Sequence, residues 1–413
     1  MNRVAPSRWT DGSMQKRVAR RYAAERRFRL FGLAAVTLSV AFLAFLLINM
    51  VWKGAGGFTA TETRLVIDFA RSDLMIDPAA LKGPKAQETL ASGGLEGVID
   101  QAATQQFGEG GGDLFGDASV RELGKLLIAD PDLLARKAEL WLPLSSKADV
   151  AAKGDGDPGI EKLLAKADTR RTFNAGFLTS SDATDPSVVG VWGALKGSFL
   201  TILVTMALAF PIGVLSALYL EEFAPRNRWT DLIEVSINNL AAVPSIIFGL
   251  LGLAVFLNFM HLPRSAPLVG GLTLALMTMP VIVIAGRNAI TSVPPSIRDA
   301  ALGVGASKMQ VVFHHVLPLA LPGILTGTII GMARALGETA PLLMIGMRAF
   351  IASPPSGMSE PATVLPVQIF LWSDEVDRGF VEKTSAAIIV LLIFMLLMNG
   401  LAIYLRNKFE RRW

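Results

Sequence analysis

Long apolar stretches alternate with polar segments along the 413-residue chain. Crossing a bilayer as a helix takes about 20 apolar residues. Five stretches of that length contain no charged residue: Phe31–Val51, Gly197–Leu220, Val235–Met260, Ser265–Gly286 and Thr384–Leu405. A sixth, Val316–Met347, contains two charged residues. The pattern therefore predicts an all-α polytopic membrane protein with six transmembrane helices.

One polar segment, residues 53–196, is as long as a soluble domain and separates the first apolar stretch from the rest. Its sequence predicts a strand at Arg64–Phe69 and helices at Val120–Ile128 and Pro131–Trp141. Gly108–Gly112 and Lys153–Gly159 are typical of loops. We therefore expect an insertion domain of the α+β class.

These patterns give the expected boundaries of the chain's parts. They are a basic tail (1–29), a first membrane helix (30–52), the insertion domain (53–196) and a core (197–413) that holds helices 2 to 6 and a loop at 287–318.

The distribution of Lys and Arg predicts the orientation, because short cytoplasmic segments are enriched in them. Segments 1–29, 221–234, 287–315 and 406–413 hold nine, two, three and four of these residues, 18 together, against four in segments 261–264 and 348–383. Both ends are therefore expected in the cytoplasm, with the insertion domain outside. The first apolar stretch is longer than the core of a typical signal peptide, about 7–15 residues. We expect it to be a retained anchor rather than a cleaved leader.

Composition excludes several kinds of site. Only 18% of the residues are charged, and the chain has no Cys and three His, so a thiolate or histidine-built metal site is not expected. The glycines at Gly111–Gly116 have the spacing of a phosphate-cradling loop, but Asp117 and Ala118 stand where Lys and Ser or Thr are required. We expect no bound cofactor or metal and no nucleic-acid partner.

The segment between the fourth and fifth predicted helices resembles the EAA loop by which ABC importer permeases dock on their ATPase. Its spacing matches that motif throughout, with Asp299 in place of Glu and His315 in place of Ile; the matching residues are Asp299, Ala300, Ala301, Gly305, Leu317 and Pro318. Small alanines allow a partner to approach closely, and Gly305 permits a sharp turn. The alternative is an ordinary amphipathic loop between two membrane helices.

The fifth predicted helix combines a row of small residues with two charges. Gly323, Gly327 and Gly331 recur every four residues, a spacing that lets membrane helices pack closely. Arg334 and Glu338 are also four apart, which places them on one face of a helix, with Arg334 near the middle of the apolar stretch.

A charge at that depth costs about 2.5 kcal/mol or more, so we expect Arg334 to face a protein-lined path. The guanidinium suits a tetrahedral oxyanion, because it can donate two parallel hydrogen bonds. Glu338 would hold Arg334 in place and would repel anions that carry no proton to donate. An ion pair with a purely structural role is the alternative.

The run Ala333–Leu343 is similar to the signature of PstA, the permease family of phosphate ABC transporters. Further similar segments are Val243–Ile246, Met279–Val283 and Leu365–Phe370, and the resemblance covers residues 190–405. The large insertion departs from the compact family form. The resemblance implies a substrate path that includes Arg334, Glu338 and Thr339, in a bacterial inner-membrane protein that is not itself an enzyme.

The resemblance also implies partners: a second permease similar to PstC, an ATPase homodimer similar to PstB that uses ATP and Mg²⁺, and a periplasmic phosphate-binding protein similar to PstS. A permease for sulfate or molybdate remains an alternative, since Arg334 would suit any oxyanion. A secondary transporter would show an internal repeat. A membrane component that senses phosphate is the third alternative.

Overall fold

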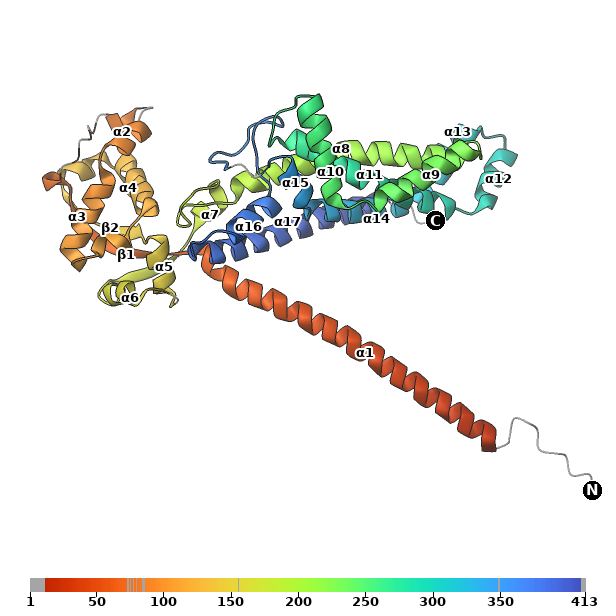
Figure 1. Ribbon diagram of the computed structural model, residues 1–413, viewed down its shortest axis with the longest axis horizontal. Helices are drawn as coiled ribbons and strands as arrows, with labels where there is room; N and C mark the ends of the chain where they lie inside the picture. The colour runs from red at the N-terminus through yellow and green to blue at the C-terminus, as the bar shows by residue number, and fades with distance from the viewer. Residues whose placement is uncertain are drawn as a thin grey trace, which may run out of the picture. The chain divides into compact units, whose positions relative to one another are not determined.

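The computed structural model describes residues 12–72, 74, 76, 78, 80–83, 86–154, 156–347 and 350–409, so the first 11 residues of the predicted basic tail lie outside the described part. The chain divides into two units, Met1–Lys53 and Gly54–Trp413. In the described residues the first unit is almost entirely one helix, α1 (Gly12–Ala55), which continues to the start of the second unit (Figure 1). This helix includes the basic residues from Lys16 to Arg29 as well as the predicted apolar stretch, and is long and apolar enough to span a membrane.

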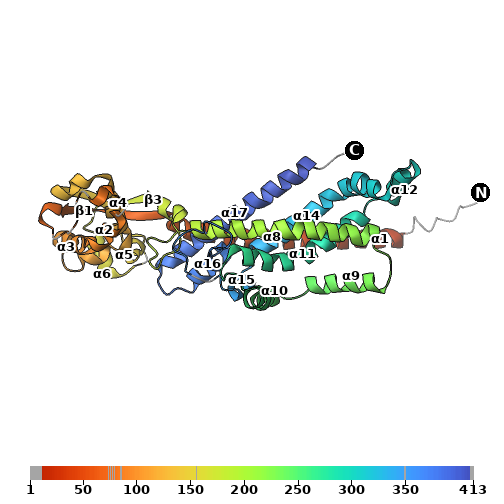
Figure 2. The same ribbon diagram turned by 90° about the horizontal axis from the view of Figure 1, so that it is seen from above.

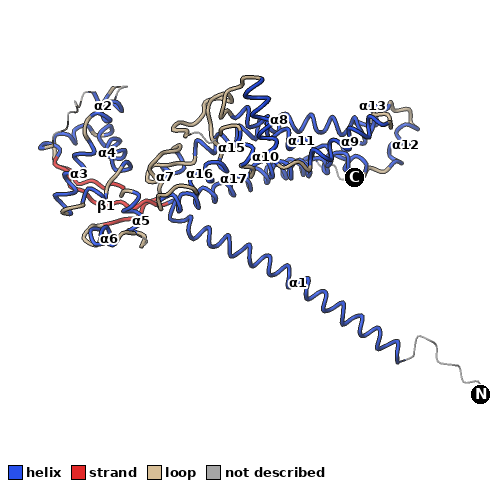
Figure 3. Tube along the Cα trace, viewed as in Figure 1, coloured by secondary structure: helices blue, strands red, loops and turns tan. Residues whose placement is uncertain are grey.

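The insertion domain is built on a three-stranded antiparallel sheet of order β2-β1-β3 (Figure 3). The central strand β1 (Thr59–Asp68) pairs with β2 (Lys137–Pro143) and with β3 (Thr169–Phe173). Residues of β1 alternate between buried and less buried positions, as expected for a strand with one face on a core. The domain's helices are α2 (Ala86–Ser92), α3 (Leu95–Phe107), α4 (Asp117–Ala129), α5 (Ser146–Ala152), α6 (Pro158–Leu164) and α7 (Ala175–Thr179).

The domain has an apolar core of its own, made largely by the sheet and by α3 and α4. Its fully buried side chains include Leu65 and Leu142 of the sheet and Leu123 and Leu127 of α4. The predicted strand at 64–69 and helix at 120–128 correspond to β1 and α4. The α+β class expected for the insertion is confirmed.

One local prediction in this domain is wrong. Residues 131–141 do not form one α-helix. Pro131–Ala135 is a short 3₁₀ helix, and the chain then enters β2. Leu140 of β2 lies opposite Leu65 of β1, so pairing with a distant strand overrides the local helical pattern. The loop expected at 153–159 is also shorter, because α6 begins at Pro158.

Four long helices form the frame of the membrane core, and Figure 2 shows α8, α11 and α14 extended alongside one another. They are α8 (Trp192–Leu218), α11 (Pro267–Thr291), α14 (Leu317–Leu336) and α17 (Gly379–Phe409). Each of α8, α11 and α17 is longer than the charge-free stretch that predicted it. Pro211, Pro280 and Pro322 lie inside α8, α11 and α14, where neighbouring membrane helices make prolines tolerable.

Two predicted spans are broken rather than continuous. Val235–Met260 is expected to be one helix, but the structure has α9 (Arg228–Ala241) and α10 (Ser245–Gly252), which continues as a π-helical segment to Phe259. The two parts are bent by 101° relative to each other. Pro244 explains the break, because proline disfavours a helical conformation in the residue before it. In the same way the stretch 316–347 ends as a helix at Leu336 and resumes only as α15 (Ala340–Met344).

The described residues contain five helices that are long and apolar enough to cross a membrane, or six if the bent pair α9–α10 is one span. This agrees with six predicted spans and confirms the fold class. The remaining helices are short: α12 (Pro295–Gly303), α13 (Lys308–Gln310) and α16 (Leu365–Ser373).

Candidate functional site

Arg334 and Glu338 lie at the break between α14 and α15. Arg334 is in the last turn of α14 and Glu338 follows the end of that helix, so the expectation that both lie on one continuous helix is wrong. The two side chains still meet, with 3.5 Å between Arg334 Nε and Glu338 Oε1. Thr339 is the N-cap residue of α15, so the three predicted path residues are grouped around one interruption of the backbone.

The guanidinium of Arg334 is only partly committed to Glu338. Its side chain is 48% exposed and that of Glu338 is 18% exposed. Among the described residues Glu338 is the only hydrogen-bond or ion-pair partner of the Arg334 side chain. Since a guanidinium has five N–H donors, most of them remain available for a ligand with several oxygen acceptors.

The depth of this site follows from the packing of α14 on α11. A Cβ placed on Gly331 would lie 3.0 Å from Thr278 Cγ2, and one on Gly327 would overlap the Cβ of Ala285. Gly323 approaches Ala289 in the same manner. Thr278 is close to the midpoint of α11, so Arg334, about one turn beyond Gly331 on α14, lies within about one turn of the α11 midpoint.

The second broken span lies beside the first. A Cβ on Gly249 of α10 would be 2.6 Å from Pro341 Cα and 2.9 Å from Met344 Cβ of α15. The short helices that follow the two breaks are therefore in backbone contact. Non-helical backbone inside a membrane is tolerated where protein surrounds it or where it lines a cavity, and broken helices of this kind form ion and substrate sites in transporters.

The predicted docking segment forms two short helices joined by a turn. Asp299, Ala300 and Ala301 lie in α12, and Gly305 has a φ of +92°, as its predicted role in a turn requires. Ala300 and Asp299 are exposed, whereas Ala301 is buried and does not belong to the outer surface. Leu317 and Pro318 begin α14.

Sequence reasoning missed the apolar part of this surface. Leu302 is 51% exposed and Val304 is 86% exposed, on either side of Gly303. Exposed apolar side chains next to the small Ala300 are the features of a surface that a partner covers.

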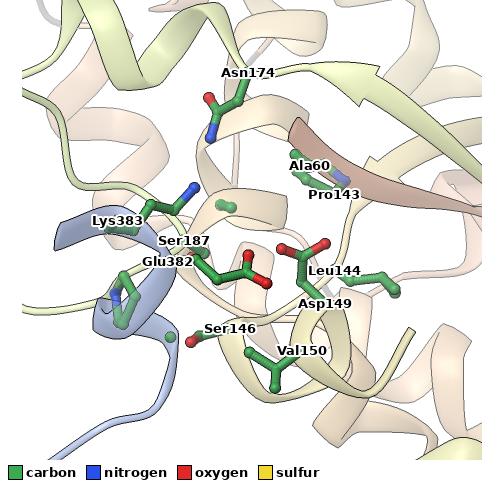
Figure 4. A pocket seen from close by; sticks show the side chains of 13 residues that line it. Ala60, Pro143, Leu144, Ser146, Asp149, Val150, Asn174, Ser187, Glu382 and Lys383 are labelled. Carbon is green, nitrogen blue, oxygen red and sulfur yellow. The ribbon is translucent and has the colours of Figure 1, made fainter. Parts of the chain in front are cut away.

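A second missed feature fastens the insertion domain to α17. Lys153 Nζ donates to Asp149 Oδ2 (2.8 Å), to Glu382 Oε2 (2.7 Å) and to the carbonyl oxygen of Gly56 (2.8 Å). Lys383 Nζ donates to the carbonyl oxygen of Gly57 (3.0 Å). Figure 4 shows Asp149 and Glu382 facing each other at a small pocket between these elements.

The domain is therefore held by buried charges as well as by its chain connections. Nothing in the sequence placed Lys153 beside Glu382, because the two residues are 229 positions apart.

The described residues contain no group of three or more His, Cys, Asp or Glu arranged to hold a metal ion.

Known proteins resemble both parts of the chain. Residues 209–413 match the family described as "Binding-protein-dependent transport system inner membrane component", and residues 15–162 match a domain of unknown function, DUF3333. The inward-facing MetNI methionine ABC transporter has a chain that aligns over 54% of this chain and 98% of its own, with 18% identity and a TM-score of 0.43.

Two curated relatives are similar over most of their own length. The probable ABC transporter permease protein YqgI of Bacillus subtilis is 31% identical over 249 residues, which are 56% of this chain and 84% of the relative. The phosphate transport system permease protein PstA of Haemophilus influenzae is 30% identical over 223 residues, 54% of this chain and 77% of the relative. The chain therefore belongs to the family of binding-protein-dependent ABC transporter permeases, as a PstA-like member with an N-terminal DUF3333 region.

Proposed function

We propose that this chain is a transmembrane permease subunit of an ATP-driven phosphate importer. The observation that carries the proposal is the Arg334–Glu338 pair, which lies at a helix break near the middle of the membrane core with most guanidinium donors uncommitted. The relatives named as phosphate transport system permeases support phosphate as the cargo.

The chemistry of the pair suits phosphate better than a fully ionised oxyanion. Arg334 supplies charge-assisted hydrogen bonds to two oxygens of a tetrahedral anion. Glu338 presents a carboxylate, which accepts a hydrogen bond from an anion that carries a proton and repels one that does not. Phosphate and arsenate carry a proton near neutral pH, whereas sulfate does not. Glu338 would therefore select against sulfate, and Thr339 would add a hydroxyl at the same break.

The other parts of the importer follow from the family. A second permease completes the path on the side where Arg334 is exposed, and a cytoplasmic ATPase docks on α12 through Ala300, Leu302 and Val304. That ATPase uses ATP and Mg²⁺, while this chain binds neither. A binding protein delivers phosphate from outside the bacterial inner membrane, with both ends of this chain in the cytoplasm.

Uptake of labelled phosphate, in cells with and without this chain, tests the proposal. We expect uptake to depend on the chain, arsenate to compete with phosphate, and a similar excess of sulfate to have little effect. Equal competition by sulfate would instead favour a permease for oxyanions in general. Uptake that does not change when the chain is removed would contradict the proposed function.

A further inference from the structure

One guanidinium near the cytoplasmic end of the core joins three separate helical elements. Arg287 of α11 donates through Nε to Glu221 Oε1 (2.6 Å) and through Nη2 to Glu234 Oε2 (2.9 Å). Glu221 lies in the π-helical turn Tyr219–Phe223 that ends α8, and Glu234 lies in α9. Arg287 and Glu221 are mostly buried, and the Glu234 side chain is 42% exposed.

A second arginine fixes the docking helix to the same elements. Arg298 of α12 donates through Nε (3.1 Å) and Nη2 (2.8 Å) to Glu222 Oε1. It also donates to the carbonyl oxygens of Val293 (2.6 Å) and Ile290 (2.9 Å) at the end of α11. Four hydrogen bonds from one side chain connect α12 to the ends of α8 and α11, so these three elements form one body.

By contrast, α9 packs on α11 with few polar contacts to that body. No residue of α9 is buried. Among the described residues, Glu234 makes the only side-chain hydrogen bond or ion pair between α9 and another helix. Ile237 adds a partly buried apolar contact. Beside the packing of α9 on α11, the Glu234–Arg287 pair is therefore the side-chain polar contact that fixes α9 to this body in the described residues.

Separating Glu234 from Arg287 also costs little free energy. Removing one partner of a buried ion pair is costly because an uncompensated charge is left behind. If α9 moves away, however, Arg287 keeps Glu221 as a partner, and the half-exposed Glu234 enters solvent. Two carboxylates on one guanidinium thus allow one contact to open while the buried charge remains paired.

Movement of α9 would be transmitted to the candidate substrate site through α10 and α15. Its end leads through Ala242–Pro244 into α10, and α10 is in backbone contact with α15 at Gly249 and Pro341. The α15 helix begins at Thr339, next to Glu338. A continuous series of packed elements therefore connects Glu234 with the break that holds Arg334.

We propose that Glu234 and Arg287 form a releasable latch that holds α9 against the α8–α11–α12 body, and that ATPase-driven displacement of α12 opens it and so admits the cargo to the cytoplasmic side. Both residues are positioning residues, which act through α9 rather than by touching the anion. The proposal rests on the proposed function only in that an ATPase docks on α12.

Charge variants in the reconstituted transporter complex test the latch. Glu234→Gln should lower the phosphate transported per ATP hydrolysed, while ATP hydrolysis continues. Arg287→Glu should be more damaging, because it gathers three carboxylates. Adding Glu234→Arg to Arg287→Glu should restore coupling, since a guanidinium again lies between two carboxylates. Asp231→Asn, at an exposed position of the same helix, is the matched control.

Wild-type transport per ATP in Glu234→Gln, or failure of the charge exchange to restore coupling in a complex that assembles normally, would overturn the proposal.

A second measurement needs no cargo. The chain has no Cys, so spin labels at Ser236→Cys of α9 and Thr291→Cys of α11 report their separation in the full complex. In the wild-type complex we expect a population with a longer distance between the labels in only one of the two states, nucleotide-free or ATP-bound. In Glu234→Gln we expect this longer distance in both states. One unchanged distance in both states of the wild-type complex would overturn the latch, whatever anion the transporter carries.

Discussion

Gly249 of α10 lies so close to Pro341 of α15 that a Cβ on this glycine would be only 2.6 Å from the Pro341 Cα. Each residue belongs to the short helix that follows a break in a membrane span. Their contact makes the two breaks one structural unit, so a change at either is transmitted to the other through the backbone.

Gly249→Ala should therefore destabilise this unit. The added methyl group meets backbone, which cannot rotate away, and overpacking of this kind costs about 1–3 kcal/mol. We expect a lower thermal midpoint for the purified protein and slower phosphate uptake. Gly400→Ala is the control, because a Cβ on Gly400 has no atom within 4 Å. Equal behaviour of the two variants would contradict the close contact.

Gly305 should be required because its backbone conformation favours glycine, and not because a larger side chain would clash with a neighbour. Its φ is +92°, yet a Cβ on it would meet nothing within 4 Å. Gly305→Val should cost about 1–3 kcal/mol of local strain and uncouple ATP hydrolysis from uptake. Gly305→Asn should be milder, since Asn tolerates positive φ better, and it serves as the comparison. Normal coupling in Gly305→Val would argue against a docking role for this turn.

Lys153 should hold the insertion domain on α17. Lys153→Met leaves the carboxylates of Asp149 and Glu382 without their shared cation, and breaking a buried ion pair costs about 3–5 kcal/mol. We expect a lower thermal midpoint and faster protease cleavage between residues 144 and 160. Lys125→Met removes an exposed ion pair instead and should change little. If both variants unfolded alike, the buried cluster would not be what fastens the domain.

Asp182 gives stability a pH dependence with a definite sign. Burial raises the pKa of this carboxyl above its usual 3.8, although the hydrogen bond from Trp372 Nε1 opposes the shift. A raised pKa in the folded state means that the protonated form is favoured on folding, so stability is lost as pH rises through the folded pKa. Asp182→Asn keeps the shape and should raise the thermal midpoint at pH 8, by an amount that shrinks as pH falls towards 4. A gain that does not depend on pH would show that Asp182 is not the group responsible.

The sequence predicted the features that depend on length and local pattern. Six apolar stretches, the strand at 64–69 and the turn at Gly305 follow from residue type and spacing, and the structure contains them. The breaks were less visible. Pro244 signals one of them, and Gly337 at the end of α14 with Pro341 in the first turn of α15 signals the other, although the charge and length of Val316–Met347 alone predicted one helix.

Long-range pairs could not be predicted. Arg287, Glu221 and Glu234 were visible as charges at the ends of apolar stretches, but only the folded chain brings them within hydrogen-bonding distance. The same applies to Lys153 and Glu382, and to β2, which becomes a strand because β1 is available to pair with it.

Phosphate uptake by Arg334 variants in membranes that contain the complete transporter tests the central claim most directly. A guanidinium that receives the anion should not be replaceable: Arg334→Ala should abolish uptake and Arg334→Lys should restore little of it, because an ammonium cannot donate two parallel hydrogen bonds. Both variants should still assemble with the ATPase, since the side chain is 48% exposed and its only ion-pair partner among the described residues is Glu338. Wild-type uptake by Arg334→Ala in an assembled transporter would contradict the account.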